Sequence, residues 1–277
     1  MTTVDGVRRL PVPPKPRRPK AMLIGWAIAA VVVAAHTVAW ETTGISLGAL
    51  VDGWRGMADF LGEAIPPDLS WKVLGPSLDA ALVTLWIGLL GTTLSVPISL
   101  LLALLAARGT APAEWVYQAA RAVLSFLRAV PDVVFALIFV TAVGLGPFPG
   151  VLALVCHNVG VMGKLWAEAL EDADPGPPQA LRSAGANRVQ VAAHALLPSV
   201  LPQLAGLLMY RFDVNVRSSL VLGLVGAGGI GFLINQSIKL FKFDEMLTHI
   251  LVVVVLVVAV DRLSAVVRRR LSEGDHA

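Results

Sequence analysis

The chain has 277 residues, of which 56% are apolar and only 15% are charged. Globular domains carry about a quarter charged residues, so this composition and a mean hydropathy of +0.74 exclude a soluble single-core enzyme and a disordered chain. The single cysteine excludes a disulfide framework and a cysteine metal cluster. Several apolar stretches approach the ~20 residues that a spanning helix needs. The sequence therefore predicts an all-α, polytopic membrane protein.

The first 74 residues divide into an arm, a span and a polar segment. Residues 1–20 hold six Lys/Arg and five prolines, and we expect a basic cytoplasmic arm. The apolar run 21–40 is too long for the core of a cleaved signal peptide, so it predicts a first transmembrane helix. Residues 41–78 carry five acidic side chains against two basic ones. We expect residues 21–74 to comprise this helix and an extracytoplasmic amphipathic segment.

Five further apolar runs define a transmembrane domain over residues 75–270, before a cytoplasmic tail at 271–277. They cover 80–106, 129–146, 151–167, 192–210 and 246–260. The apolar stretch 218–234 is different because it contains five glycines between Gly223 and Gly231. Glycine weakens a helix by about 1 kcal/mol relative to alanine, so this stretch predicts helix, break and helix, without a crossing of its own.

Basic residues set the orientation of these six spans. Six precede the first span and four follow the last, and basic flanks stay on the cytoplasmic side. We therefore expect a multi-pass protein of the inner or plasma membrane with both termini cytoplasmic. A seventh crossing would place the arginines at 268–270 outside. The lack of an internal repeat gives little support to an inverted-repeat carrier.

Sequence motifs for catalysis are missing. The chain has no nucleotide-binding P-loop, and its five histidines are scattered without metal-ligand spacing. The run Gly226–Gly231 matches G-x-G-x-x-G, but no acidic residue follows at the distance that holds a ribose. We expect no catalytic residue, cofactor, metal or nucleic acid. The glycines instead suggest a gate or a close-packing site, formed by Gly223, Gly226, Gly228, Gly229 and Gly231.

The polar stretch 179–198 places two helical pieces on either side of Gly185. By itself it is either a connecting loop or a short helix that docks into a partner. Its spacing resembles the EAA signature of ABC importer permeases, and the matching residues are Gln179, Ala180, Leu181, Gly185, Leu197 and Pro198. Two positions depart from that signature, because Gln179 replaces the acid and Ala195 the isoleucine. Segments such as Arg128–Asp132 and Leu222–Gly231 also resemble the phosphonate-type branch of these permeases, over roughly residues 75–270.

This resemblance implies a type I ABC importer permease core with a coupling helix at 176–188. The residues implied in ATPase coupling are Gln179, Ala180, Leu181, Arg182, Ala184, Gly185 and Arg188. It also implies a second permease chain in a homodimer, a cytoplasmic ABC ATPase dimer and an extracytoplasmic solute-binding protein. The expected solute is a phosphonate or a related phosphorus oxyanion. Methionine or another small solute is the alternative, and an independent channel or secondary carrier is a third.

Polar residues inside the apolar runs are candidates for a substrate path. His157 and Asn158 lie halfway along the fourth run, and Arg211 and Arg217 lie near the outer end of the fifth. Hydrogen bonding between helices accounts equally well for His157 and Asn158. For the two arginines, pairing with Asp213 or anchoring to lipid headgroups is the competing interpretation.

Overall fold

The computed structural model describes residues 19–273, and Ala58 and Asp59 mark the boundary between two compact units. The first unit contains α1 (Pro19–Thr42), α2 (Leu47–Asp52) and the start of α3 (Trp54–Ala64). The described side chains of α1 are all exposed, as expected of an apolar helix that meets lipid. Most of the predicted basic arm and the last four residues of the predicted tail lie outside the described residues.

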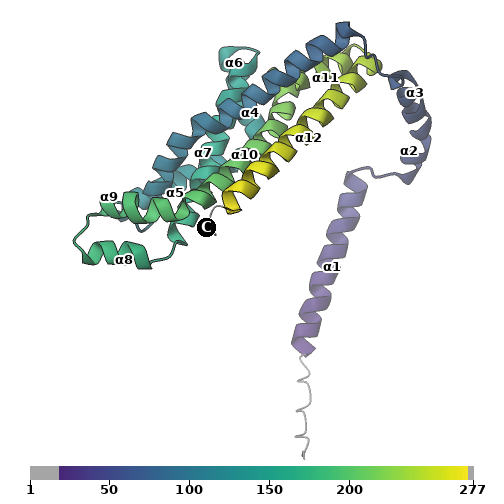
Figure 1. The fold of residues 1–277 in the computed structure, drawn as a ribbon. Coiled ribbons are helices and arrows are strands. Elements are labelled where there is room, and N and C mark those ends of the chain that lie inside the picture. Colours follow the sequence, from purple (N-terminus) through teal and green to yellow (C-terminus); the bar gives the residue numbers. More distant parts are fainter. Residues whose placement is uncertain (1–18, 274–277) are drawn as a thin grey trace, which may run out of the picture. The chain divides into compact units, whose positions relative to one another are not determined.

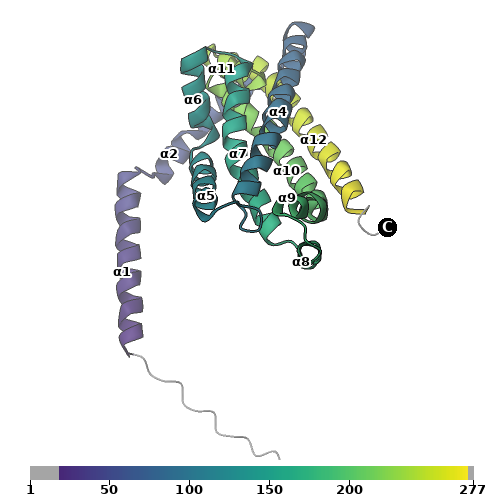
Figure 2. The ribbon, with the colours of Figure 1, turned by 90° about the vertical axis from the view of Figure 1, so that its left-hand side faces the viewer.

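The second unit is a bundle of long helices, in which α10 runs opposite to α4, α7 and α12, with short helices at its two ends. In chain order these are α4 (Trp71–Leu105), α5 (Glu114–Ala129), α6 (Asp132–Val143), α7 (Pro147–Glu171), α8 (Gly176–Ser183), α9 (Arg188–Val191), a π-helical turn (Ala192–Leu196), α10 (Leu197–Leu224), α11 (Ile230–Lys239) and α12 (Phe243–Glu273). Helices α4, α7, α10 and α12 lie side by side (Figures 1 and 2). Helices α8 and α9 lie at one end of this bundle, and α11 lies at the other.

Small residues of α4 allow its neighbours to pack closely. A Cβ atom on Gly91 would lie 2.6 Å from the Leu154 Cβ of α7, and one on Gly88 would lie 2.7 Å from a Val216 methyl of α10. Small residues at helix contacts let backbones approach in membrane bundles, where lipid removes most of the hydrophobic drive for association. The close contacts of α4 with α7 and α10 therefore form the centre of the unit.

Five described segments are long and apolar enough to cross a membrane. They are Met22–Thr42, Trp71–Leu105, Pro147–Glu171, Arg188–Lys239 and Phe243–Val267. The predicted span 129–146 corresponds to α6, whose 12 residues extend only about 18 Å. Helices α5 and α6 pass the same criteria together, but with an 84° bend between them. The predicted count of six crossings is reached only when this bent pair counts as one span.

Two spans extend further than the apolar runs predict. Helix α4 begins at Trp71, nine residues before the predicted start, because its first turns pack on α12, where Ser77 Oγ lies 2.7 Å from His249 Nδ1. Helix α10 continues to Leu224, beyond the predicted end at 210. Arg211 and Arg217 therefore lie inside this helix and not at its outer end. Partners four residues away, Asn215 and Asp213, bond to these arginines and allow the helix to continue.

The loop before α4 is tied to α12 at the α11 end of the bundle. Thr248 Oγ1 donates to the Asp68 carbonyl at 2.8 Å, and Asp68 N–H donates to the Asp244 carbonyl at 3.4 Å. The Asp68 carboxylate accepts a hydrogen bond from Ser70 N–H at 2.8 Å, which holds the pKa of Asp68 below its usual value. In the adjoining loop, the hydrogen bond from Lys242 to Glu245 raises the pKa of Lys242.

Candidate functional site

The short helix α8 has one face turned to the bundle and one face open. Pro178 is buried and Leu181 is half-buried, three residues apart on the bundle side. Gln179, Ala180 and Ala184 are exposed on the other side. Of the seven predicted coupling residues, Leu181 contributes to packing within this chain, and the other six are exposed.

A sharp turn at Gly185 separates α8 from α9. The predicted helix 176–188 ends at Ser183, and Gly185 adopts φ +89°, a conformation that glycine reaches without steric cost. Helix α9 then begins with a capping box, in which Asn187 and Gln190 each bond the other's backbone N–H at 2.9 Å. The two helical pieces predicted on either side of Gly185 are present, and the first is shorter than the predicted 176–188 because these two signals end one helix and start another.

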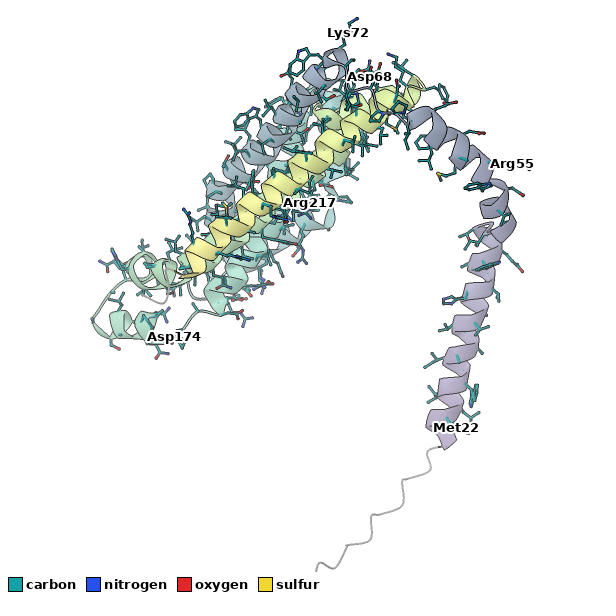
Figure 3. The ribbon with its side chains drawn as sticks, turned by 45° about the vertical axis from the view of Figure 1, so that its right-hand side comes forward. Met22, Arg55, Asp68, Lys72, Asp174 and Arg217 are labelled. Carbon is teal, nitrogen blue, oxygen red and sulfur yellow. The ribbon has the colours of Figure 1, made fainter. Side chains whose placement is uncertain are left out.

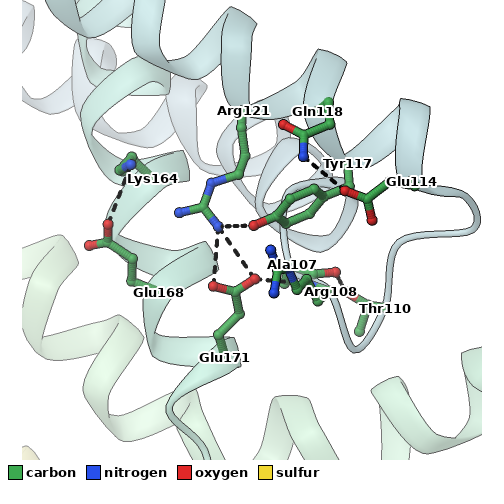
Figure 4. Close-up of polar contacts among 10 residues, drawn as sticks. All are labelled: Ala107, Arg108, Thr110, Glu114, Tyr117, Gln118, Arg121, Lys164, Glu168 and Glu171. Carbon is green, nitrogen blue, oxygen red and sulfur yellow. Dashed lines mark hydrogen bonds and ion pairs between the residues drawn. The ribbon is translucent and has the colours of Figure 1, made fainter.

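A polar cluster fixes α5 and α7 together near the base of α8. Arg121 Nη1 donates to the Tyr117 hydroxyl at 2.6 Å and pairs with Glu171 at 3.1 Å (Figure 4). Glu171 also accepts a hydrogen bond from Arg108 N–H at 3.0 Å. Both arginine side chains lie over the Tyr117 ring, at 5.4 Å for Arg108 and 5.1 Å for Arg121. These contacts join the end of α4, α5 and α7 directly before the segment that leads into α8.

The glycine-dense segment is interrupted, as the sequence predicts. Helix α10 ends at Leu224, and α11 starts at Ile230 after a turn in which Gly226, Gly228 and Gly229 all have positive φ values of 98°, 76° and 71°. L-residues with side chains rarely adopt these values. Glycine is therefore required here by the backbone itself.

The same turn leaves almost no room for side chains. A Cβ on Gly228 would lie 3.0 Å from Pro147, and one on Gly229 would overlap the Thr84 hydroxyl. A Cβ on Gly223 would lie 2.6 Å from the Gly228 carbonyl oxygen, and one on Gly231 would overlap the Leu220 carbonyl. All five predicted glycines thus lie in or beside one tightly packed break between α4, α10 and the turn before α7.

Hydrogen bonds anchor this break to its neighbours. The Thr84 hydroxyl of α4 accepts from Ile230 N–H at 2.9 Å, and Gly146 N–H donates to the Gly226 carbonyl at 3.0 Å. Thr84 is fully buried. A side-chain acceptor for the first N–H of α11 satisfies a group that a helix start otherwise leaves without a partner. Thr84 was not among the predicted residues, because a threonine within an apolar helix carries no sequence pattern.

Arg211 is the centre of a buried polar network within the bundle. It is only 8% exposed, its Nε donates to Asn158 Oδ1 at 2.8 Å, and its Nη2 donates to Asn215 Oδ1 at 3.3 Å. Asn215 Nδ2 donates to Thr92 at 2.7 Å, and Asn158 Nδ2 donates to Ser95 at 3.3 Å. No described carboxylate lies within 4.0 Å of Arg211. The network therefore holds a positive charge with amide oxygens alone.

The other two residues predicted for a substrate path lie apart from this network. Arg217 forms ion pairs with Asp213 of its own helix and with Asp261 of α12, the latter at 3.7 Å. The predicted alternative of an Arg–Asp pair is therefore correct for Arg217. His157 Nδ1 lies 3.1 Å from the Val130 carbonyl at the bend between α5 and α6. Of the four path candidates, the structure bonds only Asn158 and Arg211 to each other.

Metal-ligating residues do not cluster in the described part of the chain. No three His, Cys, Asp or Glu side chains come together there as a metal site would require. Cys156 is half-buried. Asn215 was not predicted as part of the Arg211 network. Its spacing of four residues from Arg211, which places both on one helix face, is the sequence pattern that indicates this contact.

Comparison with known proteins identifies the family. Residues 95–273 match the family model described as binding-protein-dependent transport system inner membrane component. The phosphite transport system permease protein PtxC of Stutzerimonas stutzeri is 43% identical over 234 residues, which are 83% of this chain and 83% of that protein. The phosphate-import permease protein PhnE of Mycolicibacterium smegmatis is 41% identical over 80% of this chain and 42% of its own length.

A solved structure supports the fold assignment. An inward-facing structure of the MetNI methionine ABC transporter matches with a TM-score of 0.59 and 22% identity, over 73% of this chain and 96% of that chain. The match extends the type I importer permease architecture to the bundle described above. The chain belongs to the family of binding-protein-dependent transport system inner membrane components, and it is a transport subunit and not an enzyme.

Proposed function

We propose that this chain forms the membrane path of an ATP-driven importer for a phosphorus oxyanion such as phosphite, a phosphonate or phosphate. The observation that carries this proposal is the identity of 43% and 41% to permeases of phosphite and phosphate import systems, over at least four fifths of this chain. The likeness to the methionine transporter is only 22% identical and therefore concerns the fold alone. Family membership also argues against an independent channel or secondary carrier.

Arg211 and Asn158 are the residues that we propose for the path. An arginine that is buried among amides, with no described carboxylate within 4.0 Å, places a positive charge inside the bundle without an ion-pair partner. Such a charge favours the transient approach of an oxyanion, and the guanidinium fork matches its geometry. His157, which contacts the bend between α5 and α6, and Arg217 are assigned to the wall of the same path.

The open face of α8 is the proposed coupling surface for an ABC ATPase. Gln179, Ala180, Ala184 and Gly185 would contact the ATPase, because small side chains one helical turn apart allow close approach. Leu181 would support the helix from the bundle side, and Arg182 and Arg188 would lie at the rim, on the side turned to the loop after α4. Closure of the ATPase would then move α8 and the bundle as one rearrangement.

A second copy of this chain is the proposed partner within the membrane. The side chains of Arg217 and Asp261 are 50% and 53% exposed. Arg217 lies about midway along the bundle, between Lys72 at one end and Asp174 at the other (Figure 3). Charged side chains at that depth are costly against lipid, so a protein surface or a water-filled path should cover them. A homodimer, with an ATPase dimer on one side and a solute-binding protein on the other, would do so.

The glycine break between α10 and α11 is the proposed gate or dimer-axis contact. Its location at the end of the bundle opposite α8 corresponds to the extracytoplasmic side if α8 is cytoplasmic (Figure 1). With that orientation α12 would end on the cytoplasmic side, and a crossing by α1 would place the N-terminal end there too, in agreement with the basic flanks.

Uptake by the reconstituted complex tests the proposed function. The chain, its ATPase and its binding protein would be placed in liposomes with ATP inside, and phosphite, methylphosphonate, phosphate and methionine would be offered outside. We expect ATP-dependent accumulation of at least one phosphorus oxyanion and none of methionine. Accumulation of methionine alone would contradict the proposed solute. The mass of the solubilised assembly gives the second readout, because one permease chain per complex would contradict the homodimer.

A further inference from the structure

Three arginines line one cavity between the loop after α4 and the turn that joins α8 to α9. We call it the arginine pocket; it has a volume of about 410 Å³ and is lined by Arg108, Gly109, Arg182, Ala186 and Arg188. An adjoining cavity of about 340 Å³ shares Arg108 and Arg182 and reaches Glu171. The pocket therefore connects the end of a long bundle helix to the proposed coupling element.

Among the described residues, no carboxylate forms an ion pair with any of the three arginines of the arginine pocket. Arg188 Nη1 donates to two backbone carbonyls of the loop after α4, each at 3.1 Å. The Arg108 guanidinium lies 5.4 Å from the centre of the Tyr117 ring. Within the described residues the Arg182 side chain forms no hydrogen bond or ion pair, and Glu171 already pairs with Arg121. Three like charges around one cavity repel each other, so an anion would stabilise the arrangement.

We propose that the arginine pocket binds a phosphate-type anion, either the headgroup phosphate of an anionic phospholipid or free inorganic phosphate. Arginine binds phosphate through paired, charge-assisted hydrogen bonds. Arg108 follows Leu105, the last residue of the membrane-spanning α4, by only three positions, which places the pocket at the level of the headgroups. Basic pockets between transmembrane helices are typical headgroup sites.

The geometry of α8 separates this pocket from the proposed ATPase surface. Arg182 follows Ala180 by two residues, which is a rotation of about 200° around a helix. The side chain of Arg182 therefore lies on the bundle side with Pro178, with which it lines the adjoining cavity. An ATPase seated on the exposed face of Ala180 and Ala184 would leave the arginine pocket open. A bound phosphate would link the loop after α4 to the α8–α9 turn and hold α8 in its orientation.

The test compares two variants that remove one positive charge each. Arg182→Gln removes a pocket arginine without removing a bond within the chain, and Arg270→Gln removes an exposed arginine from the last turn of α12 as the matched control. The permease–ATPase complex would be purified in phosphatidylcholine nanodiscs with and without phosphatidylglycerol. Native mass spectrometry would count retained phosphatidylglycerol, and calorimetry in phosphatidylcholine alone would measure binding of inorganic phosphate.

We expect Arg182→Gln to weaken binding about fivefold, the effect of one arginine near a phosphate surface, and Arg270→Gln to leave it unchanged. A loss confined to phosphatidylglycerol identifies a lipid site, and a loss confined to inorganic phosphate identifies a free-anion site. Equal losses in both variants, or no binding in either arm, would overturn the proposal. So would an Arg182→Gln complex that loses its ATPase while lipid and phosphate binding are unchanged. The lipid arm does not depend on the proposed solute, since oxyanion uptake is measured separately.

Discussion

Hydrogen bonds of single buried polar side chains join the helices of this bundle. Thr84 satisfies the first N–H of α11, and Asn158 and Asn215 hold the guanidinium of Arg211. Each of these groups is buried, so the loss of its partner leaves a polar atom without a hydrogen bond.

Thr84→Val should lower the free energy of unfolding by about 1 kcal/mol or more, because valine has the same shape but leaves Ile230 N–H without an acceptor. Thr93→Val is the matched control on the same helix, since Thr93 is exposed and bonds only to carbonyls of its own preceding turn. Thermal unfolding of the solubilised protein measures both. Equal unfolding midpoints for the two variants would show that the anchor of the glycine break contributes no stability.

Arg211→Lys should reduce oxyanion uptake about tenfold while the protein still folds and inserts. Lysine keeps the charge but lacks the planar fork that reaches both Asn158 and Asn215, so the charge is held in a different place. Arg262→Lys, at an exposed position of α12, is the control. Initial uptake rates in liposomes measure the effect. Wild-type rates in Arg211→Lys would remove Arg211 from the proposed path.

Two turns of the chain depend on a glycine with positive φ, one at Gly185 and one at Gly228. Gly185 turns the chain between α8 and α9 in open space, since nothing lies within 4 Å of an added Cβ. Gly228 turns the chain between α10 and α11 against Pro147. The same residue type therefore serves a surface turn at one end of the bundle and a packed break at the other.

Gly185→Glu should give an inserted, dimeric permease that no longer retains its ATPase and no longer transports. The substitution adds a bulky charge at the proposed docking turn and strains a positive-φ position by about 1–2 kcal/mol. Gly44→Glu is matched to it, because Gly44 also has positive φ and open space but belongs to the first unit. Co-purification of the ATPase measures coupling. Full ATPase association and transport in Gly185→Glu would show that the coupling assignment is wrong.

Gly228→Ala should impair transport and leave ATPase association intact. The added methyl group meets Pro147 at 3.0 Å in a conformation with φ +76° that alanine rarely adopts. Gly206→Ala, inside α10 with no atom within 4 Å of the new Cβ, should leave both activities unchanged. The larger Gly228→Leu should be more severe still. Transport at the wild-type rate in Gly228→Ala would contradict a gating or close-packing role for the break.

At the scale of the whole molecule, the number of membrane crossings depends on whether the bent pair of α5 and α6 crosses the membrane. Five segments satisfy the criteria for a span individually, and the pair with its 84° bend makes a sixth. An even number of crossings returns the chain to the side from which it started. The proposed orientation follows only if the pair crosses fully.

Accessibility of introduced cysteines tests this topology. In a chain with Cys156 replaced by alanine, a membrane-impermeant reagent added from outside should label Gly53→Cys and miss Ser272→Cys. The acid excess over residues 41–78 and the basic flanks at both ends are the reason. Permeabilised cells supply the control, because both cysteines should then react. Labelling of Ser272→Cys alone in intact cells would reverse the orientation.

Composition and periodicity alone determined the helical membrane class, the break at Gly223–Gly231 and the turn at Gly185, because apolar length and glycine dihedrals are local properties. The EAA-like spacing indicated the importer family, which the family match confirms. Tertiary structure alone decided which polar residues meet. Arg211 and Asn158 are 53 positions apart, and Thr84 and Ile230 are 146 apart, so no local pattern could pair them. It also decided the start of α4, because contacts with α12 allow the helix to begin before its apolar run. Helix α10 continues past its apolar run because Arg211 and Arg217 find partners both within the helix and on α7 and α12.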